Sequence, residues 1–131
     1  MGRYDIKMAT KEILESMEIF YKIYTEPTDI EKERSFPIAW IYLGPESVDD
    51  GDISYTNYMR NIDMEITVGS KHSSIGDKDT DMLIDKVFET LKSNFTLNGT
   101  AINLTPVSVL TDQGYFHPYA LASISYTIQM R

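Results

Sequence analysis

The C-terminal residues carry the pattern that most constrains the fold. Between residues 119 and 130, apolar or small side chains alternate with polar ones, with Ala120, Ala122, Ile124, Tyr126, Ile128 and Met130 against Ser123, Ser125, Thr127 and Gln129. A period of two residues is typical of a β-strand that buries one face. The rest of the chain must therefore supply neighbouring strands and a cover for one face of a sheet.

Three further segments are predicted to be strands. Phe36–Leu43 is apolar on both faces, which favours an interior strand with Pro37 near its start. Asn61–Gly69 alternates apolar with acidic or polar residues, and no helical pattern separates it from the preceding strand. This succession favours an antiparallel pair. Thr100–Thr111 is interrupted by Pro106, which predicts an edge position or a bulge.

Two segments have helical spacing. The first, from about Thr10 to Tyr24, is stopped by Pro27, and the second runs from about Asp79 to Asn94. Their apolar stripes are Ile13, Met17, Phe20 and Tyr24 in the first, and Ile84, Phe88, Leu91 and Phe95 in the second. The predicted order is α-β-β-α-β-β. We expect one α+β domain over residues 1–131, a mainly antiparallel four-stranded sheet with two helices packed on one face.

Charge is unevenly distributed along the chain. The 20 acidic and 12 basic residues give a net charge of −8, which argues against a basic nucleic-acid-binding surface. Residues 1–65 hold 14 acids and 7 bases, and after Lys92 the only charges are Asp112 and Arg131. This charge-poor end lacks the residues that protect an exposed sheet edge. Either the domain's own helices cover it, or a neighbouring subunit does.

The composition also limits the cellular compartment and the kinds of site that the chain can form. The chain has no cysteine, which excludes disulfides, thiolate zinc sites and cysteine nucleophiles. The N-terminus begins no apolar run, and no stretch approaches the roughly 18 apolar residues of a membrane span. We therefore expect a cytoplasmic setting with no signal peptide.

An acidic cluster comprises Glu46, Asp49, Asp50 and Asp52. A calcium-binding loop that began at Asp50 would need a glutamate at its twelfth position, where the chain has Asn61. We therefore interpret the cluster as a solvated loop and not as a metal site.

No catalytic motif is visible. His72 and His117 are the only histidines, and neither has the spacing of a metal-ligand pair. The chain has no GxSxG, P-loop or GxGxxG pattern, so we expect no catalytic residue, metal or cofactor. Asp63 and Glu65 are either paired carboxylates or simply the wet face of their strand.

Five aromatic residues fall in or beside predicted loops: Tyr55, Tyr58, Tyr115, Phe116 and Tyr119. Such side chains are frequent anchors of subunit interfaces. The alternative is that they pack against their own domain.

Taken together, the elements resemble the tail terminator proteins of long-tailed bacteriophages, of the lambda minor tail protein U kind. The resemblance spans nearly the whole chain and includes an N-terminal helix that ends near Tyr24 and a long acidic loop. The other segments that carry the resemblance are FPIAWIYLG, NIDMEITVG, TDMLIDKVFETLKSN and ALASISYTIQMR.

The resemblance implies a structural virion protein. Members of that family form a hexameric ring that caps the tail tube, ends its polymerisation and joins the tail to the head, and DNA passes through the ring. It implies a place in the virion tail, assembled in the host cytoplasm, and three kinds of partner: copies of itself, the tail tube protein and the head-tail connector. DNA is not bound specifically, and the acidic cluster would line the channel. The alternatives are another phage neck, tail completion or head-tail connector protein, and a small α+β enzyme or ligand-binding domain that uses His72 or His117 with the acidic loop.

Overall fold

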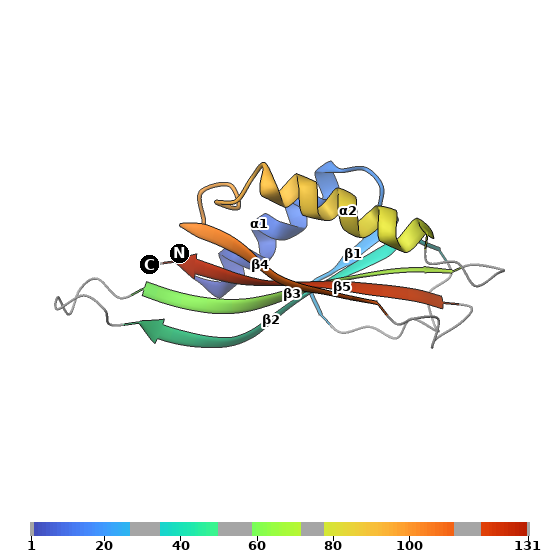
Figure 1. Ribbon diagram of the computed structural model, residues 1–131. Coiled ribbons are helices and arrows are strands. Elements are labelled where there is room, and N and C mark those ends of the chain that lie inside the picture. The colour runs from blue at the N-terminus through green and yellow to red at the C-terminus, as the bar shows by residue number, and fades with distance from the viewer. Residues whose placement is uncertain (1, 27–34, 50–58, 72–77, 112–118, 131) are drawn as a thin grey trace.

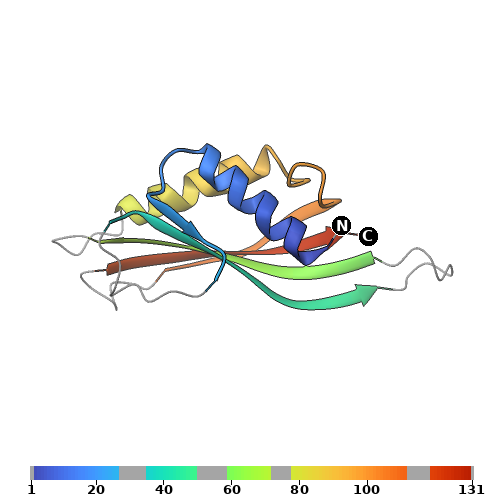
Figure 2. The same ribbon diagram turned by 180° about the vertical axis from the view of Figure 1, so that it is seen from behind.

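Two helices cover one face of a β-sheet in the computed structural model (Figures 1 and 2). The structure describes residues 2–26, 35–49, 59–71, 78–111 and 119–130. Its elements are α1 (Arg3–Ser16), β1 (Lys22–Tyr24), β2 (Ile38–Asp49), β3 (Met59–Lys71), α2 (Lys78–Lys92), β4 (Asn103–Thr111) and β5 (Tyr119–Met130). We call the covered face the helix side. The opposite face, which no described element covers, is the open side.

The sheet has five strands in the order β1-β2-β3-β5-β4. The long strands pair antiparallel, and β1 joins the edge of β2 in parallel. The α+β class is therefore confirmed. The prediction of a four-stranded antiparallel sheet is wrong, because the sheet is mixed and has a fifth strand.

The missing strand comes from the segment predicted as the second half of the first helix. That helix ends at Ser16, and Glu18 has a left-handed backbone with φ of 57°, which is incompatible with a continuing α-helix. The Tyr21 amide then donates a hydrogen bond to the Pro37 carbonyl at 2.7 Å. Tyr24, the last residue of the predicted helical stripe, lies in β1 and pairs with Trp40, so the apolar spacing that suggested a longer helix partly serves a strand.

The helix α1 also begins earlier than expected. Gly2 is its N-cap, and the Gly2 amide donates to the Asp5 carboxylate at 2.9 Å. Its buried stripe is Ile6, Ala9, Thr10, Ile13 and Leu14, which follows the spacing of one helical face. The Thr10 hydroxyl is satisfied by the Ile6 carbonyl at 2.8 Å, so it can be buried in this stripe.

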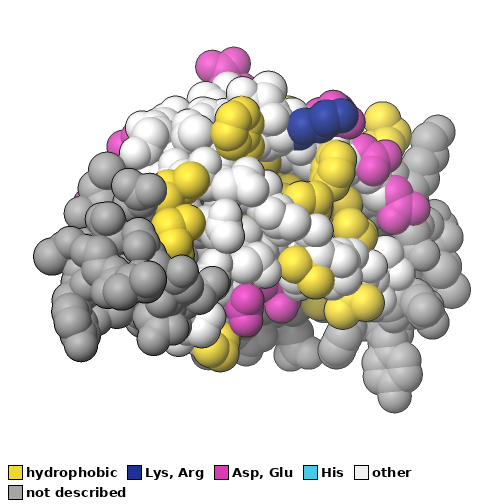
Figure 3. Space-filling model, turned by 60° about the vertical axis from the view of Figure 1, so that its left-hand side comes forward, with side chains coloured by type: hydrophobic (Ala, Val, Ile, Leu, Met, Phe, Trp, Pro, Cys, Tyr) yellow, Lys and Arg dark blue, Asp and Glu magenta, His cyan; other side chains and the backbone are white. Residues whose placement is uncertain are grey.

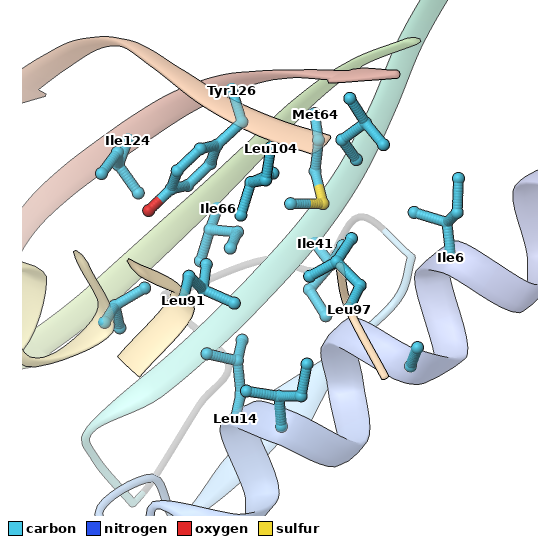
Figure 4. Packing of buried hydrophobic residues seen from close by; sticks show 14 of the residues in the cluster. Ile6, Leu14, Ile41, Met64, Ile66, Leu91, Leu97, Leu104, Ile124 and Tyr126 are labelled. Atoms are coloured by element: carbon cyan, nitrogen blue, oxygen red, sulfur yellow. The ribbon is translucent and has the colours of Figure 1, made fainter. Parts of the chain in front are cut away.

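The core lies between the helices and the sheet (Figure 4). Strand β5 has the predicted bounds and alternation: Ala120, Ala122, Ile124, Tyr126, Ile128 and Met130 are buried, and the residues between them are partly exposed. The buried side chains of β3 that face the same layer are Ile62, Met64, Ile66 and Val68. The alternation in the sequence therefore identified the core face of both central strands.

Two outer strands contain irregularities at their prolines. The expected loop from Gly44 is partly strand, because β2 resumes pairing with β3 at Glu46 after a register shift that skips Pro45. Strand β4 is an edge strand and has a register shift between Pro106 and Ser108, which confirms the expectation for Pro106.

On the open side, a tryptophan crosses a strand glycine. A Cβ atom built on Gly69 would lie 3.0 Å from the Trp40 ring and 3.1 Å from Leu121. The absence of a side chain at Gly69 therefore lets Trp40 and Leu121 pack closely over β3.

We predict that Gly69→Ala lowers the free energy of unfolding by about 1–2 kcal/mol relative to Gly44→Ala, because the new methyl group displaces Trp40. Gly44 is a matched control: it lies in a strand, and a Cβ atom added there would have its nearest neighbour 3.5 Å away. Urea unfolding of both variants measures the difference. Equal stabilities would contradict the proposed packing constraint.

Candidate functional site

The outer edge of β4 presents apolar side chains to the surface. Val107, Val109 and Leu110 are 64%, 50% and 66% exposed, and we call these three residues the apolar edge. Among the described strands, β4 pairs only with β5, so its other side is an edge of the sheet. An exposed edge strand offers unpaired backbone groups to any strand that docks beside it.

The apolar edge projects on both faces of the sheet. Val109 lies opposite the buried Ile124 and therefore points to the helix side, whereas Leu110 lies opposite Ser123 and points to the open side. α2 packs over β3 and β5, which leaves Val109 half exposed. A protein that docked at this edge would therefore contact apolar side chains on both the helix side and the open side.

No charged side chain interrupts this part of the chain. Residues 93–111 contain no Asp, Glu, Lys or Arg. The end of the molecule where α2 finishes and β4 begins comes forward in Figure 3, which shows groups of hydrophobic side chains on a mostly uncharged surface. Natural edge strands usually carry a charge that prevents pairing with another chain. The edge of β4 is without that protection.

The opposite edge of the sheet is formed by the short strand β1. β1 pairs with β2 over Ile38–Trp40. Further along β2, the guanidinium of Arg3 donates hydrogen bonds to the carbonyl oxygens of Leu43 and Gly44, at 3.2 and 3.0 Å. These two backbone acceptors are thereby satisfied by a charged side chain. The two edges of the sheet therefore differ in chemistry.

The acidic cluster is divided by the structure. Glu46 lies in β2 and forms an ion pair with Arg60 of β3, in which Nη2 and Nε lie 2.6 and 3.1 Å from the same Oε1 atom. Asp49 is the last residue of β2 and pairs with Met59. Asp50 and Asp52 lie outside the described residues. The charge of Glu46 is thus balanced by a neighbour, which weakens its contribution to an acidic channel lining.

Of the aromatic residues and histidines expected in or beside loops, the structure describes Tyr119. It is the first residue of β5, and its ring centroid lies 6.0 Å from that of Phe36, so it packs against its own domain. Tyr55, Tyr58, Tyr115 and Phe116 lie outside the described ranges, as do His72 and His117.

Asp63 and Glu65 lie on the open side of β3 and are exposed, as expected for the wet face of a strand. Within the described ranges, no group of three or more histidine or acidic residues is placed to hold a metal ion. None of the described helices is long and apolar enough to cross a membrane.

Two features of the candidate site were missed from the sequence. Arg3 and Arg60 each lie in segments without a motif, and their carbonyl and carboxylate partners are 40 and 14 residues away along the chain. The charge-poor run after Lys92 indicated that an uncharged surface lies in this part of the chain. The run includes both β4 and β5, so it did not predict which of the two strands is at the edge of the sheet.

Searches against known protein families and against curated proteins find no match to this sequence.

We predict a modest coupling between Glu46 and Arg60, because both side chains are only about a quarter exposed and share a two-donor contact. In a double-mutant cycle of Glu46→Gln and Arg60→Gln, we expect a coupling of about 0.5–1 kcal/mol in urea unfolding. Lys86→Gln, which removes one exposed positive charge from α2, is the control for net charge. A coupling of zero would show that the pair does not hold β2 to β3.

Proposed function

We propose that this protein is a structural subunit of a bacteriophage tail: a tail terminator that caps the tail tube, ends its polymerisation and joins the tail to the head. In this proposal it has no catalytic role, and its partners are copies of itself, the tail tube protein and the head-tail connector. It acts in the virion tail as a ring, a hexamer as in the family it resembles. The single observation that carries the proposal is the apolar edge of β4.

The apolar edge supports an assembly role because its exposed apolar side chains are unfavourable in water and would be buried by a second protein. Exposed valine and leucine side chains on an unprotected edge strand promote association, and natural monomers usually avoid them. With a net charge of −8, two copies repel each other over most of their surfaces. The uncharged residues 93–111 form a region where another protein can approach without bringing like charges together.

The difference between the two edges supports a ring over a two-fold dimer. A ring needs a heterologous interface, in which one surface of each subunit contacts a different surface of the next. The edge strand at one end of the sheet is β4, and the edge strand at the other end is the three-residue β1, beside which Arg3 binds carbonyl oxygens of β2. Two edges of different length and chemistry suit head-to-tail contacts.

The acidic character of the chain supports passage of DNA without binding. Phosphate groups are repelled by a negative surface, so a duplex can move past it without forming lasting contacts. Asp49, Asp50 and Asp52 remain our candidates for the channel lining, whereas Glu46 is balanced by Arg60.

The direct test is the size of the particle in solution. We expect light scattering over a concentration series to give a mass that increases toward a closed oligomer, and electron microscopy to show rings, either alone or on tail tubes isolated from the same phage. A protein that remains monomeric at every concentration and does not bind the ends of these tubes would contradict the proposal.

We predict that Val109→Lys combined with Leu110→Lys weakens assembly. Burial of two ammonium groups in the interface should raise the dissociation constant at least about tenfold. Both side chains are already exposed in the subunit, so thermal unfolding should change little. Met82→Lys, at an exposed apolar residue of α2, is the matched control and should assemble normally. Normal assembly of the double variant would exclude the apolar edge as the contact surface.

Replacement of both histidines separates the structural hypothesis from an enzymatic one. We expect the double variant His72→Ala and His117→Ala to assemble as the wild type does, because the proposal gives neither residue a chemical role. Tube capping and circular dichroism measure assembly and folding. A folded variant that no longer caps tubes would favour a function that depends on these side chains.

A further inference from the structure

The turn that connects α2 to β4 contains the only Asn-Gly pair of the chain, Asn98–Gly99 (Figure 1). Both residues are exposed, and both have a left-handed backbone, with φ of 58° for Asn98 and 85° for Gly99. A Cβ atom built on Gly99 would have no neighbour within 4 Å beyond the adjacent residues of the chain. Nothing in the described structure therefore shields Gly99 from solvent.

An Asn-Gly pair is the sequence in which asparagine most readily loses its side-chain amide. The backbone nitrogen of the glycine attacks Cγ of the asparagine, the bond from Cγ to Nδ2 breaks, and ammonia leaves with the proton of the glycine nitrogen. The resulting cyclic succinimide takes up water and opens to aspartate or isoaspartate, and either product carries a new carboxylate. Glycine favours this reaction because it has no side chain beside the attacking nitrogen and its backbone rotates freely.

In the folded chain, the side chain of Asn94 holds Asn98 by two hydrogen bonds. Nδ2 of Asn94 donates to Oδ1 of Asn98 at 2.8 Å, and the backbone amide of Asn98 donates to Oδ1 of Asn94 at 3.0 Å. The first bond fixes the side chain that would be attacked, and the second fixes the backbone of the same residue. Asn94 therefore restrains both parts of Asn98 that take part in ring closure.

The attacking nitrogen is held as well. The backbone amide of Gly99 donates to the Thr96 carbonyl at 3.0 Å, and the Ala101 amide donates to the same carbonyl at 2.9 Å. The Thr100 hydroxyl donates to the Leu97 carbonyl at 2.7 Å. Attack on Cγ requires loss of the Gly99 amide proton and rotation of the backbone at Asn98. These hydrogen bonds must therefore open before the reaction can occur, and the rate depends on how easily this turn opens.

We propose that Asn98 is a site of spontaneous deamidation, and that the side chain of Asn94 slows the reaction by holding Asn98 in an unreactive geometry. The product carries one more negative charge, within residues 93–111, where the sequence has no charged side chain. The reaction thus changes the charge of the neutral region on which the assembly proposal relies. The chemistry itself needs only the folded subunit, so it can be tested whether or not the protein forms a ring.

The test is the rate at which the full chain gains the mass of deamidation in mildly alkaline buffer, with peptide mapping to locate the change. Mass is the correct signal, because isomerisation at the Asp50–Gly51 pair leaves the mass unchanged. We expect Asn98 to react before any other asparagine. In Asn94→Ala it should react about five- to tenfold faster, the effect of one or two hydrogen bonds.

Ser93→Ala is the matched control, because it removes a neighbouring exposed hydroxyl that donates to the Thr90 carbonyl and does not contact Asn98. Asn98 in this variant should react at the wild-type rate. Thermal unfolding shows whether each variant is folded. If Asn94→Ala does not fold, wild-type protein unfolded in urea replaces it, because both hydrogen bonds from Asn94 are then lost and the rate at Asn98 should rise by at least the same factor.

Two results would overturn the proposal. The first is that Asn98 stays unmodified both in Asn94→Ala and in the urea-unfolded chain, which would show that it is not a deamidation site. The second is that the folded Asn94→Ala variant, or the urea-unfolded chain in its place, reacts no faster than the native wild type. In that case the contact with Asn94 does not protect Asn98.

Discussion

The antiparallel pairing of β3 with β5 is the constraint on which the rest of the structure depends. It runs without a register shift from Arg60–Met130 to Lys71–Tyr119, whereas both outer antiparallel pairs contain a shift. Because a slip of one residue would turn every side chain to the opposite face, this register places Ile62, Ile66 and Ile124 against the helices. The outer strands can therefore absorb Pro45 and Pro106 without disturbing the core.

The same arrangement leaves the sheet with two unlike edges. On one side, β1 and Arg3 occupy backbone groups of β2. On the other, β4 ends the sheet with exposed valine and leucine side chains in a run without charge. In the assembly proposal, this difference between the edges gives each copy a direction for association, and a directional contact that closes would produce a ring. The assembly proposal rests on this asymmetry together with the resemblance to tail terminators.

Much of the candidate site was beyond prediction from the sequence. The charge-poor run after Lys92 indicated a surface in need of a cover, and the alternation in β5 placed Tyr126 in the core. Neither pattern revealed that the Tyr126 hydroxyl makes no hydrogen bond to any described residue, because that depends on where α2 lies over the sheet. Glu46 was assigned to an acidic loop, yet it lies in a strand, since a register shift past Pro45 lets pairing resume beyond the proline. The pairing with Arg60 is a consequence of that register.

The sequence by itself determined the α+β class, the second helix, the last strand and the face that each central strand buries. These features follow from local periodicity, because the spacing of apolar residues reports directly which side chains lie on one face. Only the tertiary structure decided that residues 22–24 leave the first helix to become a fifth, parallel strand, and which edge of the sheet remains open. Strand order and edge protection depend on hydrogen bonds between residues far apart in the chain, such as those from Arg3 to Leu43 and Gly44, and no local pattern encodes them.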